Sequence, residues 1–143
     1  MTDAGFALDP RLRDDTHPVV ALPLCELLLM DDARFPWLIL VPRRVGMREL
    51  LDLDAVEQAS LWSETRLASR ALRAVASHDK LNLGALGNVV RQLHVHVVGR
   101  REGDAAWPGP VWGHGRAERY EAHERVQLIA ALRAAINDLP NDP

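Results

Sequence analysis

The sequence has only one cysteine, Cys25, among its 143 residues. A lone cysteine excludes an intrachain disulfide, and its place inside an apolar stretch is typical of a small buried side chain. The uninterrupted apolar segments fall short of the ~20 residues that a membrane helix needs. The N-terminus also lacks a basic start followed by an apolar run. We therefore expect a cytoplasmic protein with no membrane span and no export signal.

The chain also lacks an excess of positive charge, because its formal net charge is -3. This balance offers no broad electrostatic surface for duplex nucleic acid or for an anionic membrane, so any bound anion must be held locally. We find no internal repeat and no low-complexity tract. Hydrophobic residues make up 48% of the chain, which is enough for one core. We expect residues 1–16 to form a flexible N-terminal segment and residues 17–143 to form a single domain.

The hydrophobic pattern predicts alternating pairs of strands and single helices. Asp54, followed by the acidic Glu57 and by apolar residues at spacings of three and four, is typical of a capped helix start. The predicted elements are strands at 24–30 and 37–41, a helix at 54–77, strands at 80–84 and 89–99, and a helix from about 116. Strands that follow one another through tight turns favour an antiparallel sheet with helices on one face. The predicted class is therefore α+β.

One strand carries a row of polar side chains. Because side chains alternate along a strand, Gln92, His94 and His96 share one face and the apolar residues between them face the helices. A rise of ~3.3 Å per residue places the two imidazoles ~7 Å apart, which suits a phosphate and its ester oxygens. A neutral imidazole can attack phosphorus, and a second imidazole or an amide can donate hydrogen bonds where negative charge develops.

Two other interpretations of this histidine pair stay open. The two imidazoles can simply be solvated or satisfied within the core. They can also bind a metal ion such as zinc, for which His114 or His78 would supply a third ligand.

Two blocks of the sequence resemble the histidine-triad (HIT) superfamily. The segment LGNVVRQLHVHVVGR, residues 86–100, resembles its signature strand, in which three histidines alternate with apolar residues. Upstream, FPWLILVPRR followed by ELLDLDAVEQASLW resembles the strand and the helix entry of that family, so the resemblance covers about residues 24–100. It implies an α+β fold with a five-stranded antiparallel sheet, a homodimer, a purine nucleotide bound over the signature strand, and no required cofactor.

The resemblance also assigns roles to residues of the signature segment. It makes His94 the nucleophile that attacks the α-phosphorus of a nucleotide conjugate, forms a nucleotidyl-histidine, and then releases the nucleotide to water or another acceptor. His96 and Gln92 would contact phosphate or leaving-group oxygens, and Asn88 would supply a polar contact just before the strand.

Departures from the family pattern weaken this assignment. Gln92 stands where the family has its first histidine, and glutamine cannot take up a proton, so charge stabilisation there is expected to be weaker. Val89 stands where nucleotide hydrolases usually have a hydroxyl side chain. The alternative function is therefore a catalytically weak or inactive nucleotide-binding or interaction protein with the same fold.

Two candidate aspartates lie outside the signature segment, and a pair of arginines lies at its end. Asp31 is similar in place to a family residue that holds ribose hydroxyls, but a solvated or turn-capping aspartate is an equally good interpretation, and Asp32 competes for the same role. Arg100 and Arg101 are well placed to raise the local positive potential, but arginines that leave a strand are more often solvated.

The segment 103–115 is rich in glycine, proline and tryptophan, and we expect a long loop there. Trp107 or Trp112 can stack on a base or close the cleft, and His114 can act as a second acid or phosphate ligand. The structural alternative is that this loop covers the sheet or completes a dimer contact, for which Val111 and Trp112 would be natural apolar members.

Overall fold

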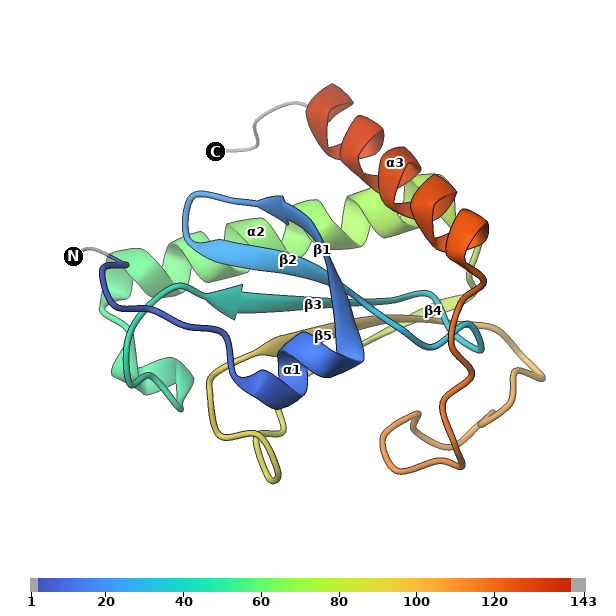
Figure 1. The fold of residues 1–143 in the computed structure, drawn as a ribbon, viewed down its shortest axis with the longest axis horizontal. Coiled ribbons are helices and arrows are strands. Elements are labelled where there is room, and N and C mark those ends of the chain that lie inside the picture. The colour runs from blue at the N-terminus through green and yellow to red at the C-terminus, as the bar shows by residue number, and fades with distance from the viewer. Residues whose placement is uncertain (1–2, 140–143) are drawn as a thin grey trace.

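The computed structural model describes residues 3–139 as a five-stranded antiparallel sheet with helices on its faces (Figure 1). Its elements are α1 (Pro10–Asp15), β1 (Thr16–Ala21), β2 (Cys25–Met30), β3 (Trp37–Pro42), the 3-10 helix η1 (Leu50–Asp52), α2 (Ala55–Val75), β4 (Lys80–Gly84), β5 (Val95–Arg100) and α3 (Ala122–Asp138). The strand order is β1-β2-β3-β5-β4. The predicted α+β class and the five-stranded sheet are confirmed. No helix among the described residues is long and apolar enough to cross a membrane.

The long helix α2 begins where the sequence predicts. The Asp54 side chain accepts the Glu57 N–H at 2.8 Å, and the Glu57 carboxylate accepts the Asp54 N–H at 3.1 Å. This reciprocal pair satisfies two of the backbone donors that a helix start leaves without partners. The cap fixes where α2 starts, so its apolar side chains turn toward the sheet.

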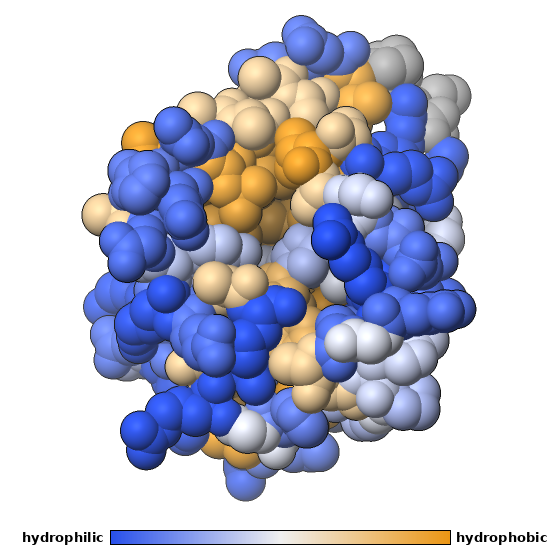
Figure 2. All heavy atoms as spheres, turned by 90° about the vertical axis from the view of Figure 1, so that its right-hand side faces the viewer, coloured by the Kyte–Doolittle hydropathy of each residue, from blue (hydrophilic) through white to orange (hydrophobic). Residues whose placement is uncertain are grey.

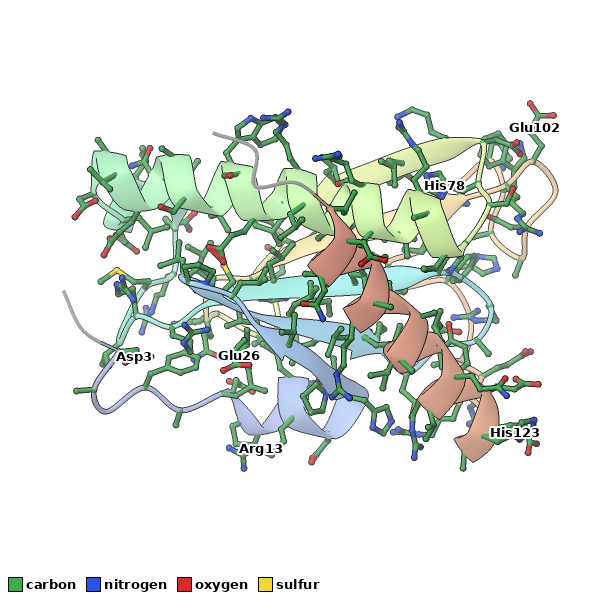
Figure 3. All side chains as sticks on the ribbon, turned by 90° about the horizontal axis from the view of Figure 1, so that it is seen from above. Asp3, Arg13, Glu26, His78, Glu102 and His123 are labelled. Carbon is green, nitrogen blue, oxygen red and sulfur yellow. The ribbon has the colours of Figure 1, made fainter. Side chains whose placement is uncertain are left out.

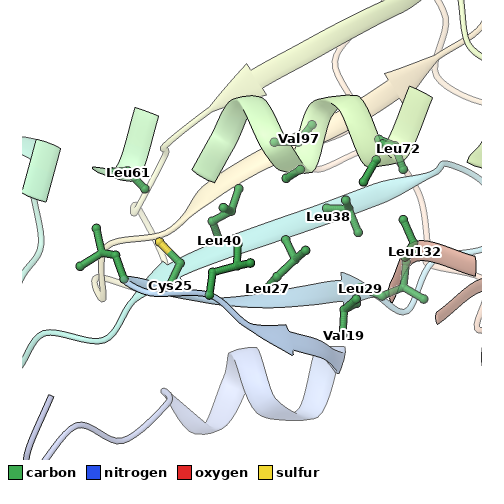
Figure 4. Packing of buried hydrophobic residues seen from close by; sticks show 14 of the residues in the cluster. Val19, Cys25, Leu27, Leu29, Leu38, Leu40, Leu61, Leu72, Val97 and Leu132 are labelled. Carbon is green, nitrogen blue, oxygen red and sulfur yellow. The ribbon is translucent and has the colours of Figure 1, made fainter. Parts of the chain in front are cut away.

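The main core lies between the first face of the sheet and the helices α2 and α3. Leu61 and Leu72 of α2 and Leu132 of α3 lie over buried side chains of the strands (Figure 4). Leu93 and Val97, which alternate with the two histidines of the signature segment, belong to this cluster. Since side chains on a strand alternate, packing of these apolar residues turns His94 and His96 to the second face.

The second face of the sheet is covered by α1 and by part of the segment between β5 and α3. It has a core of its own, formed by Leu12, Leu28, Phe35, Trp37, Ile39, Val41, Val98, Ala106 and Val111. The helices α2 and α3 lie on one face as predicted, but the short helix α1 packs on the other. The sequence did not indicate this helix, because its only buried side chain is Leu12.

The folded part begins earlier than the predicted boundary at residue 17. Helix α1 ends at Asp15 and β1 starts at Thr16, which pairs with Met30 of β2. The predicted boundaries also include residues 1–2 and 140–143, which lie outside the described residues. A domain of residues 17–143 therefore leaves out a helix that closes the second core.

Two element boundaries differ from the prediction. Strand β5 starts at Val95 rather than at 89, because residues 85–94 leave the sheet edge and form a loop. Helix α3 starts at Ala122 rather than near 116. The residues before it are extended because the Ala33 N–H donates to the Glu118 carbonyl at 2.6 Å.

Candidate functional site

His94 and His96 lie side by side on the second face of the sheet. His94 directly precedes β5 and His96 is the second residue of that strand. Their ring centroids are 4.8 Å apart, and each residue is only 6% exposed. The alternation predicted from the sequence therefore holds, and the pair is buried rather than solvated.

The hydrogen bond of His94 defines which of its nitrogens carries a proton. Its Nδ1 lies 2.7 Å from the carbonyl oxygen of Gln92. A carbonyl oxygen can only accept, so Nδ1 is the protonated nitrogen and donates. In the neutral ring, Nε2 then holds a lone pair, which is the form that a nucleophile or a general base requires.

The hydrogen bond of His96 has the opposite sense. The indole Nε1–H of Trp37 donates to its Nδ1 at 3.0 Å. The neutral ring therefore carries its proton on Nε2 and offers an N–H donor. Burial, together with the neighbouring His94, lowers the pKa of His96 to about 3, so this ring is uncharged near neutral pH.

Gln92 holds the N-terminal segment through its side chain. Its Nε2 donates to the Ala7 carbonyl and its Oε1 accepts the Asp9 N–H, both at 2.9 Å. Both ends of the amide are thus bonded to the backbone just before α1. The sequence predicted a phosphate contact for this amide, whereas in the structure it already has protein partners.

An open cleft with a volume of about 440 Å³ lies beside His94. It is lined by Arg48, Glu49, Leu50, Ala85, Leu86, Gly87, Arg91, Gln92, Leu93 and His94. Among the described residues, neither the Arg48 nor the Arg91 guanidinium makes a hydrogen bond or an ion pair, whereas the Glu49 carboxylate accepts the backbone N–H of Asp52. Two cations therefore face the cleft, and neither was predicted as a site residue. Only the loop geometry brings them to His94.

Asn88 and Val89 lie on the loop that forms one wall of this cleft. Both are exposed, and the neighbouring Gly87 lines the cleft while Asn88 does not. Asn88 therefore lies next to the predicted site without forming part of its wall.

Asp31 lies at the other end of the sheet from His94. Leu29 pairs with Leu38, and Leu38 pairs with Val97, so Asp31 lies level with Gly99. Gly99 is five residues after His94, which is roughly 16 Å along the strand direction. This placement separates the predicted ribose contact from the histidine pair.

The Asp31 carboxylate is already bonded within the protein. It accepts the Tyr120 N–H at 2.9 Å and binds His17 and Arg119. Burial opposes ionisation, but these donors lower the pKa of Asp31 below its ordinary value. Asp32 pairs in the same way with the guanidinium of Arg34. The two aspartates are buried and hold the residues before α3, so neither is the solvated aspartate that the structural interpretation allowed.

The loop 103–115 packs on the second face of the sheet. Trp112 lies against His96, with ring centroids 5.5 Å apart, and Val111 is 2% exposed within the second core. Val111 is therefore not available for a dimer contact, which corrects that expectation. His114 is exposed, and its carbonyl accepts a hydrogen bond from Arg34. Figure 2 views this end of the molecule, where hydrophilic side chains predominate.

Arg100 is buried rather than solvated, with an exposed fraction of 1%. Its guanidinium lies 5.6 Å from the centroids of both Phe35 and Trp107, and it binds Asp104 through two nitrogens. Arg100 holds the pKa of Asp104 at about 2. Trp107 therefore stacks on a protein cation, which argues for a structural role of this side chain.

The metal interpretation needs a third ligand near the histidine pair. Glu26 pairs with Val41 and so lies level with His94, which makes it a marker for the position of His94 along the sheet. Figure 3 shows His78 well away from Glu26, toward the other end of the molecule. The Nδ1 of His78 lies 2.8 Å from the Ala76 carbonyl. Within residues 3–139, no group of three His, Cys, Asp or Glu side chains is placed to hold a metal ion. Within the described part of the chain, neither of the third ligands proposed from the sequence, His78 or His114, therefore completes a metal site with the pair.

Solved structures similar to this chain come from several bacteria. A histidine triad (HIT) protein from Sinorhizobium meliloti is 47% identical, with a TM-score of 0.91 over 94% of this chain and 99% of the other. A histidine triad protein from Bradyrhizobium japonicum is 50% identical, with a TM-score of 0.89 over 92% of this chain and 98% of the other. Both matches cover more than nine tenths of this chain.

Curated relatives and a family profile agree with these structures. Two proteins named AP-4-A phosphorylase, from two strains of Mycobacterium tuberculosis, are 35% identical over 111 residues. That match covers 70% of this chain but only 55% of each relative, so the chain spans about half the length of the relatives it matches. The profile of the HIT domain matches residues 11–103, which include most of the helix α1, the cleft and both histidines. The chain therefore belongs to the HIT domain family.

Proposed function

We propose that this protein is a nucleotidyl hydrolase or transferase that cleaves a nucleoside phosphate conjugate at the α-phosphorus. The Nε2 lone pair of His94 attacks phosphorus, the bond to the leaving group breaks, and a nucleotidyl-histidine forms. Water or another acceptor then attacks the same phosphorus, and the phosphorus–nitrogen bond breaks. The leaving group takes its proton from solvent or from a nearby donor.

The observation that carries this proposal is the bond between His94 Nδ1 and the Gln92 carbonyl at 2.7 Å. It holds the proton on Nδ1, so Nε2 is ready to attack without a separate base. The neighbouring His96 offers an N–H donor, which suits a phosphoryl oxygen that gains negative charge in the transition state. One ring therefore supplies an electron pair and the other supplies a hydrogen bond.

The cleft beside His94 suits a substrate with several negative charges. Arg48 and Arg91 line it together with His94, and guanidinium groups bind phosphate strongly. The name of the curated relatives, AP-4-A phosphorylase, also supports a phosphoanhydride such as a dinucleoside polyphosphate. Phosphoramidates, whose leaving group is an amine, remain the second class of bond to test.

A binding protein without turnover is the alternative. It is favoured by Gln92, whose amide is bonded to Ala7 and Asp9 and cannot supply a charge. Measurable nucleotide binding with no release from any conjugate would support this alternative and contradict the enzyme.

The test is a substrate screen of the wild type and of His94→Ala. The panel contains nucleoside phosphoramidates, dinucleoside polyphosphates and adenylylated amino acids, each with and without a chelator. We expect nucleotide release that survives the chelator, is lost in His94→Ala, and is accompanied by an acid-quenched covalent adduct on the wild type. Full turnover by His94→Ala would disprove the mechanism, and loss of release with chelator would disprove the proposal that no metal is required.

We also propose a homodimer that forms through the edge strand β4. This strand ends the sheet order, and Leu83 on it is 45% exposed beside Trp62 of α2, which is 60% exposed. An unpaired strand edge next to apolar side chains is a typical surface for a second copy. Light scattering at several concentrations tests this, and Leu83→Lys should give monomers. A wild type that stays monomeric at high concentration would contradict the dimer.

A further inference from the structure

His96 is held by an indole that is distant in the sequence. The Nε1–H of Trp37 on β3 donates to Nδ1 of His96 on β5 at 3.0 Å, across a sequence separation of 59 residues. Both residues are buried, with exposed fractions of 4% and 6%. An indole nitrogen can only donate, so this contact requires Nδ1 of His96 to carry no proton.

The surroundings of His96 give its ring few other polar partners. Its cross-strand neighbours are Ile39 of β3 and Gly84 of β4, and the Trp112 ring lies on it from the loop. The titratable group that faces it is His94, whose ring centroid is 4.8 Å away. Burial and His94 both disfavour a charge on His96.

The two histidines therefore need opposite tautomers. His94 donates from Nδ1 to a backbone carbonyl and keeps its lone pair on Nε2. If His96 adopted the same tautomer, both rings of the pair would hold a lone pair on Nε2, and neither Nε2 would be a donor for a phosphoryl oxygen. The Gln92 carbonyl fixes the tautomer of His94, but it does not contact His96. A separate group must fix the second ring.

We propose that Trp37 is a positioning residue that holds His96 as the Nε2–H tautomer, so that the site presents one lone pair and one hydrogen-bond donor. The catalytic consequence rests on the proposed function, whereas the tautomer itself does not. Trp37 thus acts through His96 rather than on the substrate.

Two tryptophan variants separate the hydrogen bond from packing. Trp37→Phe keeps an aromatic ring but removes the hydrogen-bond donor. Trp112→Phe is the control, because the Trp112 indole packs against His96 without a hydrogen bond to it. The ¹⁵N shifts of labelled histidine at neutral pH report the tautomer. We expect Nε2–H in the wild type and in Trp112→Phe, and a mixture or Nδ1–H in Trp37→Phe. A Trp37→Phe protein that keeps Nε2–H, or the same change in both variants, would overturn the proposal.

A second measurement uses only the wild type, so it does not require that a variant folds. An N–H···N hydrogen bond transmits a scalar coupling between its two nitrogens, so Trp37 Nε1 and His96 Nδ1 should be coupled in the labelled full-length chain. Absence of this coupling, with His96 on the Nδ1–H form, would overturn the proposal.

The kinetic constants of Trp37→Phe test whether the tautomer of His96 matters for catalysis. With a substrate whose release depends on His94, Trp37→Phe should lower kcat by about tenfold or more while KM changes little, because a transition-state donor is lost. Unchanged kcat would overturn the catalytic role. If the wild type has no turnover, the proposed function fails while the NMR result still decides the role of Trp37.

Discussion

The backbone carbonyl of Gln92 lies 2.7 Å from Nδ1 of His94, while the side chain of the same glutamine binds Ala7 and Asp9. One residue thus orients the proposed nucleophile with its main chain and ties down the N-terminal segment with its amide. Glutamine stands here in place of the first histidine of the family pattern. Its amide both donates and accepts, so it can make the two bonds to Ala7 and Asp9.

This relationship predicts the effect of changing Gln92. Gln92→Ala should lower the free energy of unfolding by about 1–2 kcal/mol, because one partly buried and one exposed hydrogen bond are lost. Urea denaturation measures this, and hydrogen exchange should show faster opening at residues 7–9. Gln92→His restores a histidine at this position but cannot make both bonds, so it should lose stability as well. Unchanged exchange at Ala7 and Asp9 in both variants would show that the amide does not anchor the segment.

Arg100 is predicted to be essential for the second core. Arg100→Lys keeps the charge but loses the two-nitrogen contact with Asp104, the bond to Asn82 and the stacking between Phe35 and Trp107. We expect a loss of about 2–3 kcal/mol in the free energy of unfolding. The control is Arg101→Lys, since Arg101 is exposed and donates to the Ser77 carbonyl. Equal losses in the two variants would contradict the role given to Arg100.

The lowered pKa of His96 predicts that the protein loses stability in mild acid. Its folded pKa, about 3, lies below its ordinary value of 6.5, so the unfolded chain binds more protons between these values. Its contribution is therefore fully present above pH 6.5 and is lost as the pH falls toward 3, by up to about 1.4 kcal/mol per pH unit.

The measurement is the free energy of unfolding of the wild type and of His96→Gln between pH 7.5 and about 4.5. The difference between the two proteins removes the titration of carboxylates that they share. The wild type should lose more stability than the variant over this range. Parallel curves would mean that His96 titrates normally in the folded protein.

The arginines of the cleft predict a preference for charged leaving groups. The double variant Arg48→Gln and Arg91→Gln should lower kcat/KM for a dinucleoside polyphosphate by about tenfold or more, because two phosphate-binding cations are lost. Turnover of a phosphoramidate with an uncharged amine should change much less. A matched control is Arg101→Gln, since Arg101 is exposed and lines a separate hollow away from the cleft residues. Equal losses on both substrates would contradict a role in leaving-group choice.

The sequence by itself determined the elements whose signals are local. The reciprocal acids Asp54 and Glu57 located the start of α2, and alternation around Leu93 and Val97 placed His94 and His96 together on the other face. These signals depend on residues within a few positions of one another, so periodicity and capping rules reach them. The resemblance of the signature segment then indicated the family.

Only the tertiary structure decided what each polar side chain binds. Gln92 meets Ala7 across a separation of 85 residues, Trp37 meets His96 across 59, and Asp31 meets Arg119 across 88. Such contacts depend on strand register and on the path of loops, which a local pattern does not encode. For that reason the sequence could propose Gln92 and Asp31 as ligand contacts, whereas the fold gives both of them partners within the protein. The tautomers of the two histidines likewise follow from an indole and a carbonyl that only the packed sheet brings to them.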